Sequence, residues 1–452
     1  MRLIETLATT DVLAKLFSDA SVLEAMLRFE AALARVEARL GIVPQAAAEK
    51  IAAVAKPEFF DAEAISRDSL RVGTPVIPLV KALRERVHAD DPAAASFVHW
   101  GATSQDVADT ALVLLLKQAY TIFEFDLSRL EESLQRLSEK HAKTVMVGRT
   151  LLQAAPPVTF GLKAAGWLGA IRRSRRKLNE SFTDALILQF GGASGTLAFL
   201  GDKGITVGKA LADELDLTYP EAPWHTHRGR LAALMCACGV LTGTLGKMAR
   251  DISLLTQNEI GEVAEGRDAG GGGSSTMPHK HNPVGCVLTL AAANRVPGLV
   301  AAFLSGMIQE HERGAGGWQA EWPTVAAIIQ ATGLAIHSMA EVAEGLTVNT
   351  ARMQSNIEAT HGAVFAEKAM LLLSPRIGRD SAHGLLEKAS QEAVASGRLL
   401  SEVLGEMREV KGHLDSKALH DLENSDLYLG VAEEFRTRLL ASLGPDFRSK
   451  KE

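Results

Sequence analysis

One long apolar stripe constrains the fold of this chain more than any other sequence feature. Between residues 112 and 137 an apolar side chain recurs at every third or fourth position, with no intervening glycine or proline. This spacing places the stripe on one face of an α-helix, which would be about 38 Å long at 1.5 Å per residue. So long an apolar face needs other long helices to cover it, and the stripe therefore predicts a helical bundle. Its members are Leu112, Leu116, Ala119, Phe123, Leu127, Leu130, Leu134 and Leu137.

Other segments support an all-α fold. Residues 228–263, 284–312 and 323–344 are rich in Ala, Leu and Met and allow further long helices. Near the N-terminus the same helical spacing recurs in Met26, Phe29, Leu33, Val36 and Leu40. Gly41 follows, and a glycine at this place is a typical helix C-terminus. Alternating strand patterns are short and scarce, the best being residues 144–147 and 187–190.

The pattern of helices and breaks suggests three domains. We expect an N-terminal helical domain (1–110), a central long-helix bundle (111–350) and a small C-terminal helical domain (351–452). Breaks fall at residues 100–104, 148–157, 191–204 and 266–283. Loops held between rigid helices often carry functional sites, so these four segments are the first places to search.

Composition excludes several classes of protein. The net charge of −6 provides no basic field for nucleic acid. The N-terminus lacks a basic segment followed by an apolar core, and no uninterrupted apolar run is long enough for a membrane span, so we expect a cytoplasmic protein. Cys236, Cys238 and Cys286 are the only cysteines, and we interpret them as reduced and structural.

The segment 270–283, which reads GGGGSSTMPHKHNP, is the most distinctive in the chain. It matches neither the phosphate-binding loop, which needs Gly-Lys-Ser/Thr, nor the dinucleotide fingerprint. Its lysine and asparagine, Lys280 and Asn282, suit the stabilisation of a carbanion beside a carboxylate. Such a carbanion places a second negative charge on the carboxylate oxygens, which a fixed cation and amide can offset.

This segment resembles the signature of the fumarase/aspartase superfamily, and two further segments follow that family's order. They are 99–106 (HWGATSQD) and 148–153 (GRTLLQ). The resemblance implies a homotetramer with a twenty-helix core, in which each active site combines segments from three subunits. It also implies a small-molecule substrate and no cofactor or metal.

The resemblance assigns roles to individual residues. Ser274 corresponds to the catalytic base, while Lys280 and Asn282 hold the substrate carboxylate and its enolate-like form. Thr103 and Ser104 would donate hydrogen bonds to a carboxylate, and Arg149 and Arg313 are candidate clamps for another. The remaining candidate substrate-binding residues are Thr150, Gln153, Ser275 and Met277.

Two departures from the superfamily pattern indicate the type of reaction. Lyases of this family usually pair a histidine with a glutamate, and these positions are Leu151 and Val287 here. Such a pair helps a leaving group of high pKa to depart, whereas a carboxylate of pKa about 4 needs no such help. The loss of both partners therefore favours lactonisation, in which a substrate carboxylate adds to a double bond of the same molecule.

The chain resembles the branch of the superfamily that performs this reaction, the 3-carboxy-cis,cis-muconate cycloisomerases of protocatechuate breakdown. The resembling segments are 77–83 (IPLVKAL), 188–195 (LQFGGASG), 223–226 (PWHT) and 309–313 (QEHER). At Leu151 and Ala154 a polar aromatic residue or a histidine would be expected. Either another residue fills that role or the acyl acceptor differs.

The sequence disfavours three alternatives. An adenylosuccinate lyase would need phosphate-binding groups where Trp318 and Trp322 stand, and tryptophan cannot replace a charged donor. An inert structural homologue resembling a lens crystallin is disfavoured by the intact Ser274, Lys280 and Asn282. The His-x-His pairs at 225–227 and 279–281 lack the further ligands that a structural zinc site requires.

Overall fold

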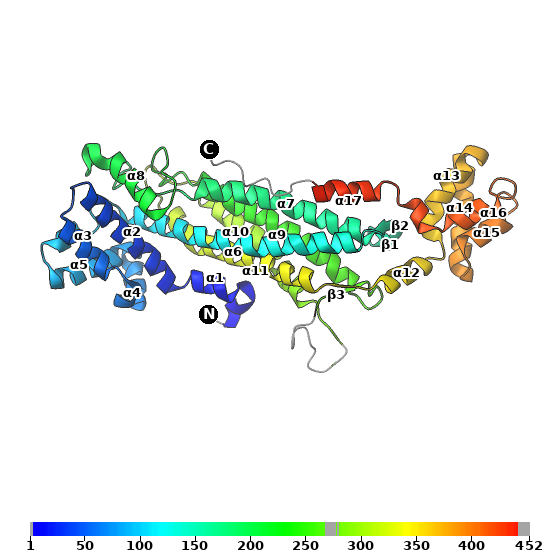
Figure 1. Cartoon of the computed structure of the whole chain (residues 1–452), viewed down its shortest axis with the longest axis horizontal. Coiled ribbons are helices and arrows are strands. Elements are labelled where there is room, and N and C mark those ends of the chain that lie inside the picture. Colours follow the sequence, from blue (N-terminus) through cyan, green and yellow to red (C-terminus); the bar gives the residue numbers. More distant parts are fainter. Residues whose placement is uncertain (1–2, 267–276, 278–279, 442–452) are drawn as a thin grey trace. The chain divides into compact units, whose positions relative to one another are not determined.

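The computed structural model describes residues 3–266, 277 and 280–441, and these are predominantly helical (Figure 1). The first helices are α1 (Asp11–Leu16), α2 (Asp19–Arg39), α3 (Gln45–Val54), α4 (Ala62–Val72), α5 (Val76–Asp90) and α6 (Ser104–Lys140). Then come α7 (Phe160–Ala185), α8 (Gly204–Leu215), α9 (Gly229–Leu255), α10 (Val284–Ser305) and α11 (Gly317–Gly345). The C-terminal helices are α12 (Thr350–Glu358), α13 (Ala366–Ile377), α14 (Arg379–Ser396), α15 (Leu400–Glu406), α16 (Ser416–Leu422) and α17 (Ala432–Ala441).

The apolar stripe that predicted a bundle lies on α6, and every member of it is buried. The all-α prediction is confirmed. The helices expected at 228–263 and 284–312 are shorter than predicted, because α9 ends at Leu255 and α10 at Ser305. The α11 helix begins at Gly317, six residues before the expected start.

Contacts divide the chain into two compact units, each assembled from three stretches of sequence. The first comprises residues 1–127, 174–246 and 288–338, and the second comprises 128–173, 247–287 and 339–452. The boundaries fall within α6, α7, α9, α10 and α11, so each of these helices contributes residues to both units. The division into three domains expected from sequence stays a prediction.

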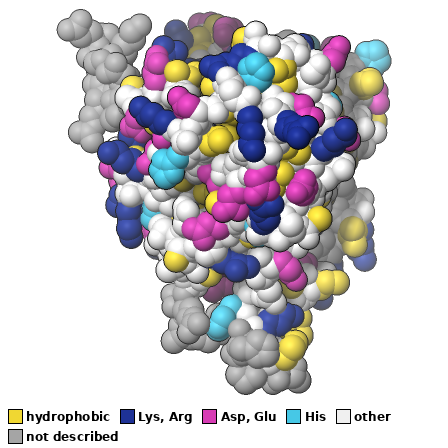
Figure 2. Space-filling model, turned by 90° about the vertical axis from the view of Figure 1, so that its right-hand side faces the viewer, with side chains coloured by type: hydrophobic (Ala, Val, Ile, Leu, Met, Phe, Trp, Pro, Cys, Tyr) yellow, Lys and Arg dark blue, Asp and Glu magenta, His cyan; other side chains and the backbone are white. Residues whose placement is uncertain are grey.

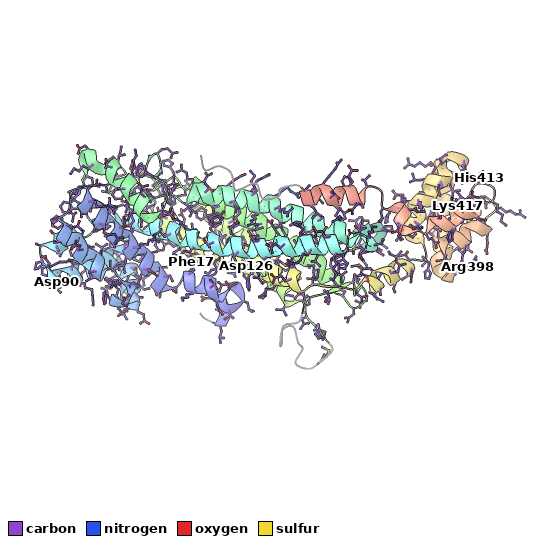
Figure 3. All side chains as sticks on the ribbon, in the orientation of Figure 1. Phe17, Asp90, Asp126, Arg398, His413 and Lys417 are labelled. Atoms are coloured by element: carbon purple, nitrogen blue, oxygen red, sulfur yellow. The ribbon has the colours of Figure 1, made fainter. Side chains whose placement is uncertain are left out.

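Helices of each unit are joined by buried or half-buried polar contacts. In the first unit Asp126 of α6 (labelled in Figure 3) lies 3.1 Å from a ring nitrogen of His337 on α11. In the second unit the indole N–H of Trp167 on α7 donates to Asp251 of α9 at 2.9 Å. Because these partners are far apart in sequence, they fix how neighbouring helices align.

Two small antiparallel sheets interrupt the helices. A hairpin joins β1 (Val145–Thr150) to β2 (Gln153–Thr159), and β3 (Val263–Ala264) pairs with β4 (Thr347–Val348). The expectation of a loop at residues 148–157 was therefore wrong, because these residues form most of the hairpin. The strand candidate at 187–190 is reduced to an isolated bridge between Ile187 and Thr218.

The hairpin belongs to the second unit and packs on its C-terminal helices. Val147 of β1 is part of a hydrophobic cluster that α12–α16 also form, including Phe365, Leu373 and Leu404. The cluster anchors β1, while Leu151 and Leu152 in the turn of the hairpin are largely exposed. On the face that Figure 2 displays, acidic and basic side chains are intermixed, with exposed hydrophobic ones between them.

Candidate active site

Lys280 and Asn282 lie directly before α10, in the second unit. Lys280 is exposed and Asn282 is half-buried. Within the described residues neither side chain has a hydrogen-bond partner, although the Lys280 amide donates to the Met277 carbonyl at 3.0 Å. An ammonium group and a carboxamide are thus available two positions apart for an anionic ligand. Ser274 and Ser275 lie outside the described residues.

Arg149 of β1 makes a bidentate ion pair within the second unit. Its two terminal nitrogens donate to the carboxylate of Glu262 at 2.9 and 2.7 Å. Glu262 is fully buried and also accepts a hydrogen bond from Asn356 of α12 at 2.7 Å. A single carboxylate therefore joins the hairpin, the segment before β3 and α12. Sequence analysis missed Glu262, because nothing local marks it as the partner of an arginine 113 positions earlier.

The two predicted residues beside the hairpin turn, Thr150 and Gln153, form its closing pair. Both are exposed. Between them Leu151 and Leu152 adopt left-handed backbone conformations, with φ of 49° and 65°. Their side chains are 96% and 77% exposed. Leucine is a poor residue for this two-residue turn, which favours Asn-Gly, so the apolar tip is retained against local conformational preference.

Thr103 and Ser104 stand at the N-terminus of α6, in the first unit. Thr103 is the last residue before the helix, and its carbonyl accepts from the amide of Asp106 at 3.0 Å. The two hydroxyls have no hydrogen-bond partner among the described residues. The N-terminus of a helix attracts anions through its unpaired amides and its dipole. The geometry therefore suits the carboxylate-binding role that the sequence assigned to these residues.

Asp106 fixes the backbone around this site. Its carboxylate accepts hydrogen bonds from the amides of Gly191 (3.0 Å), Gly192 (2.8 Å) and Thr103 (3.1 Å). It also lies 2.7 Å from Nε2 of the buried His225. Asp106 thus ties the start of α6 to the glycine-containing segment after Phe190. The motifs containing Asp106 and His225 were recognised from sequence, but their contact was not.

Arg313 lies near Asp106 in the first unit. One terminal nitrogen donates to the carbonyl oxygens of Gly192 (2.7 Å) and Ala193 (3.1 Å). Burial lowers the pKa of Arg313, while the nearby Asp106 opposes that effect. The structure therefore brings Thr103, Ser104 and Arg313 to one region of the first unit. The other described candidates, Arg149, Thr150, Gln153, Met277, Lys280 and Asn282, belong to the second unit.

A fully buried ion cluster supports this region. Arg228 donates to Asp109 of α6 at 2.7 and 3.0 Å and to Glu321 of α11 at 2.6–3.0 Å. Burial opposes the charge of Arg228, but Asp109 and then Glu321 outweigh it and raise the pKa of the guanidinium. The indole N–H of Trp318 donates to Asp109 at 2.9 Å. Trp318 therefore supports the buried cluster.

An apolar cavity in the first unit is a poor candidate for an anion site. It has a volume of about 190 Å³. One of its walls is Phe17, labelled in Figure 3. The other lining residues are Val22, Ala111, Leu112, Leu115, Trp322, Pro323 and Ala326, none of which carries a charge. A substrate with several carboxylates would lose its hydration there without gaining ionic partners.

The described ranges contain no group of three or more His, Cys, Asp or Glu side chains able to hold a metal ion. The three cysteines are free thiols; Cys238 and Cys286 are buried and Cys236 is half-buried. Three helices, α9, α10 and α11, are long and apolar enough to cross a membrane by length and composition. Their most apolar windows are 61%, 22% and 72% buried respectively, so α10 is the one whose apolar residues are mostly uncovered.

Comparison with known proteins identifies relatives along the whole chain. A family model described as "Lyase" matches residues 5–298, and one described as "Adenylosuccinate lyase C-terminus" matches residues 362–439. A 3-carboxy-cis,cis-muconate cycloisomerase of Bradyrhizobium diazoefficiens is 47% identical over 95% of both chains. A nitrosuccinate lyase of Streptomyces davaonensis is 41% identical over 95% of this chain and 92% of its own.

A solved structure supports the same relationship. The 3-carboxy-cis,cis-muconate lactonizing enzyme of Pseudomonas putida superimposes with a TM-score of 0.91 at 45% identity, covering 97% of this chain and 98% of that one. Agreement at this level extends through both units, including the small C-terminal helices. The resemblance inferred from the three sequence segments is thereby confirmed. The chain is a member of the lyase family of the fumarase/aspartase superfamily, and its relatives there include 3-carboxy-cis,cis-muconate cycloisomerases.

Proposed function

We propose that the protein is a cycloisomerase that converts 3-carboxy-cis,cis-muconate into 4-carboxymuconolactone. The observation that carries this proposal is the 47% identity to a cycloisomerase over 95% of both chains. The absence of the histidine–glutamate pair at Leu151 and Val287 agrees with it, since a carboxylate needs no proton in order to leave. The reaction belongs to the degradation of protocatechuate.

The proposed step is an intramolecular addition. One carboxylate oxygen of the substrate forms a bond to a carbon of the conjugated diene. The π electrons move toward the carbon beside a second carboxylate, giving an enolate-like intermediate. That carbon then takes a proton from Ser274, whose oxygen is reprotonated from solvent, so the lactone holds every atom of the substrate and one added proton. In the reverse direction the ring carboxylate leaves as an anion.

Two described features support stabilisation of the intermediate. Lys280 and Asn282 offer a cation and an amide donor that are not engaged by other described residues, and these would bind the enolate-like carboxylate. The Thr103 and Ser104 hydroxyls at the N-terminus of α6 would bind another carboxylate, assisted by the helix dipole. Thr150, Gln153, Ser275 and Met277 would complete the substrate contacts.

The arginine contacts refine their proposed roles. Arg149 would act mainly through Glu262, by holding the hairpin that carries Thr150 and Gln153. Arg313 donates from one terminal nitrogen to the carbonyls of Gly192 and Ala193, and from the other to the Glu312 carbonyl at 3.2 Å and the Gln105 side chain at 3.5 Å. Unlike Arg149, it binds no carboxylate among the described residues. Of the two arginines, Arg313 is therefore the better candidate for direct contact with a carboxylate.

We further propose that the active protein is a cytoplasmic homotetramer. The support is the apolar helix α10, of whose most apolar window only 22% is buried within one chain. An apolar helix exposed to water is unfavourable, so this surface is expected to be covered. Further copies of the chain would cover it in a symmetric oligomer. In this proposal three subunits contribute the hairpin, the start of α6 and the Lys280–Asn282 segment to each site.

The test is a spectrophotometric assay with enzymatically generated 3-carboxy-cis,cis-muconate, without added metal or nucleotide. Loss of the diene absorbance with the wild type, and little loss with Ser274→Ala, is the expected result. No loss with a protein shown to be tetrameric would contradict the proposal. Sedimentation analysis of the same sample tests the oligomeric state independently.

Nitrosuccinate elimination is the second candidate, favoured by the 41% identity to a nitrosuccinate lyase. Nitrite, like a carboxylate, is a weakly basic leaving group, so the absence of the histidine–glutamate pair is compatible with both reactions. Parallel assays with nitrosuccinate and adenylosuccinate would distinguish these reactions from cycloisomerisation. Inactivity with every substrate would instead favour the inert structural homologue.

A further inference from the structure

The carboxylate of Glu265 caps a helix that begins on the far side of the signature loop. Its two oxygens accept hydrogen bonds from the amides of Gly285 (3.1 Å) and Cys286 (2.9 Å). These amides belong to the first turn of α10, 20 and 21 residues later in the chain. Glu265 therefore holds the two ends of segment 266–283 together.

This arrangement replaces the usual local cap of α10. Pro283 occupies the N-cap position, because its carbonyl accepts the first helical hydrogen bond, from the Val287 amide at 3.0 Å. Proline has no side-chain acceptor, whereas an N-cap residue normally uses one to bind the second or third amide of the helix. Glu265 binds the second and third amides, at Gly285 and Cys286, in its place.

The residue before the proline is Asn282, and asparagine is among the strongest capping residues. Its side-chain oxygen can bind a backbone amide two or three positions on, here Val284 or Gly285. In the structure the Asn282 side chain makes no such bond among the described residues. Of these two amides, that of Gly285 is bound by Glu265, and that of Val284 donates to the backbone carbonyl of Asn282 at 2.9 Å.

The base of the loop is rigid on the side of Glu265. Val263 and Ala264 pair with β4, and the neighbouring Glu262 binds Arg149 and Asn356. A Cβ atom added to Gly266 would lie 2.7 Å from Gly345, so the backbone there is closely packed. The Cys286 thiol also contacts Glu265. Burial is the main cause that raises the pKa of this thiol above its usual range, and its hydrogen bond to Glu265 adds to the effect. Glu265 thus acts from a fixed position.

We propose that Glu265 is a positioning residue that caps α10 in place of Asn282, so that the Asn282 amide stays available to the substrate with Lys280 beside it. The proposal rests on the proposed function. It adds a residue outside the signature motif and explains how a strong capping residue directly before a helix is kept free for chemistry.

The kinetic test compares Glu265→Ala with the wild type in the cycloisomerase assay. We expect kcat to fall about tenfold to a hundredfold, the range expected when a reacting group is displaced by about 1 Å. KM should change much less, because the interaction at issue belongs to the transition state. Glu265→Gln, which retains one acceptor oxygen, should recover part of the loss. Glu259→Ala is the matched control, because it removes an exposed carboxylate six positions earlier that has no hydrogen-bond or ion-pair partner among the described residues.

A second variant separates positioning from helix stability. Glu265→Ala/Pro283→Ser gives α10 a local cap and should restore part of kcat by releasing Asn282. Equal kcat for Glu265→Ala and the wild type would overturn the proposal. So would a loss of kcat that is matched by dissociation or by a large fall in melting temperature, because the role would then be structural.

A crystal structure of Glu265→Ala tests the same idea without any activity. We expect the Asn282 side-chain oxygen to have moved onto the amide of Gly285, which the substitution leaves without its acceptor. An unmoved Asn282 side chain would refute the proposal even if activity were lost. If the wild type shows no cycloisomerase activity, the proposed function fails while this structural outcome still decides the role of Glu265.

Discussion

At the scale of single residues, buried charges distinguish this chain from a simple apolar bundle. Arg149 with Glu262 and Arg228 with Asp109 and Glu321 satisfy their charges by bidentate contacts. Glu37 of α2 does not, because both of its carboxylate oxygens are buried without a hydrogen-bond partner among the described residues. Buried ion pairs add little net stability, but removing one partner is costly. A buried carboxyl without a partner avoids the cost of burying a charge by staying protonated.

Glu37 should make stability depend on pH. Burial, and then repulsion by Glu30, raise the pKa of Glu37 to about 9. In the unfolded chain a glutamate has a pKa of about 4.3, so between these values only the folded protein keeps the proton. The stability that Glu37 contributes is therefore fully present below pH 4 and is lost as pH rises toward 9.

The variant Glu37→Gln cannot titrate and should lack this dependence. Its free energy of unfolding relative to wild type should increase between pH 5 and pH 8.5, by at most roughly 1.4 kcal/mol per pH unit. Urea denaturation across that range provides the measurement. A constant difference between the two proteins would show that Glu37 is ionised in the folded state.

The Arg149–Glu262 pair should behave as a unit. Glu262→Leu leaves the Arg149 guanidinium without its partner and should cost about 3–5 kcal/mol of unfolding free energy. Arg149→Met should be costly for the same reason, because Glu262 is fully buried. The double variant should cost clearly less than the sum, as measured by a double-mutant cycle in denaturant. Additive effects would mean that the two side chains do not interact in solution.

At the scale of elements, the hairpin β1–β2 has the least usual local chemistry. Its turn uses Leu151 and Leu152, both with positive φ and both largely exposed. Left-handed conformations cost roughly 1–2 kcal/mol for each residue with a side chain of this kind. Strain of this kind is typical of functional sites, and the flanking Thr150 and Gln153 are proposed to bind substrate.

Replacing the tip with Leu151→Asn/Leu152→Gly should therefore stabilise the hairpin and impair the reaction. We expect an increase of about 1–2 kcal/mol in unfolding free energy and a fall of about tenfold or more in kcat/KM. Thermal denaturation and the cycloisomerase assay measure the two effects. Unchanged kcat/KM would exclude a role for the leucines in the site, and lower stability would show that the tip is held by contacts beyond one chain.

At the scale of the whole molecule, α10 is the element that one chain leaves least complete. It is apolar along its length, yet its Val284, Val287 and Leu304 side chains are 42%, 55% and 41% exposed. Complete burial of a large apolar side chain contributes about 1.5–3 kcal/mol, so covering the exposed half of each would contribute roughly 1 kcal/mol, and several copies multiply the gain. Assembly around α10 would thus make a large contribution to the stability of the proposed tetramer.

A charge placed on this surface should prevent assembly. Leu304→Arg is expected to shift the protein from tetramer to smaller species in sedimentation velocity, with loss of activity because shared sites are incomplete. Glu85→Arg on α5 adds positive charge at a position already exposed and should stay tetrameric. A tetrameric and active Leu304→Arg protein would place the interface elsewhere.

Sequence alone determined the class of fold and the chemistry of the central loop. The apolar spacing of α6 reports helical periodicity directly, because each residue's face depends only on its position along the same helix. The order of residues around Lys280 and Asn282 identified the superfamily, because this motif is a short contiguous segment that can be read without knowing the fold. The all-α architecture and the family were therefore accessible before any coordinates.

Tertiary structure decided which groups meet. The partners of Arg149, Arg228 and Glu265 lie between 20 and 119 positions away, and nothing in a local pattern selects them. The strand candidate at 144–147 is the start of β1, but the rest of the hairpin was not predicted, because Gly148, Pro156 and Pro157 read as loop residues. Strand pairing and packing against Phe365 and its neighbours stabilise it instead. Local sequence thus specified the helical periodicity and the types of reactive side chain. Contacts between residues distant in sequence specified where those side chains lie, because residues become partners only when folding brings them close in space.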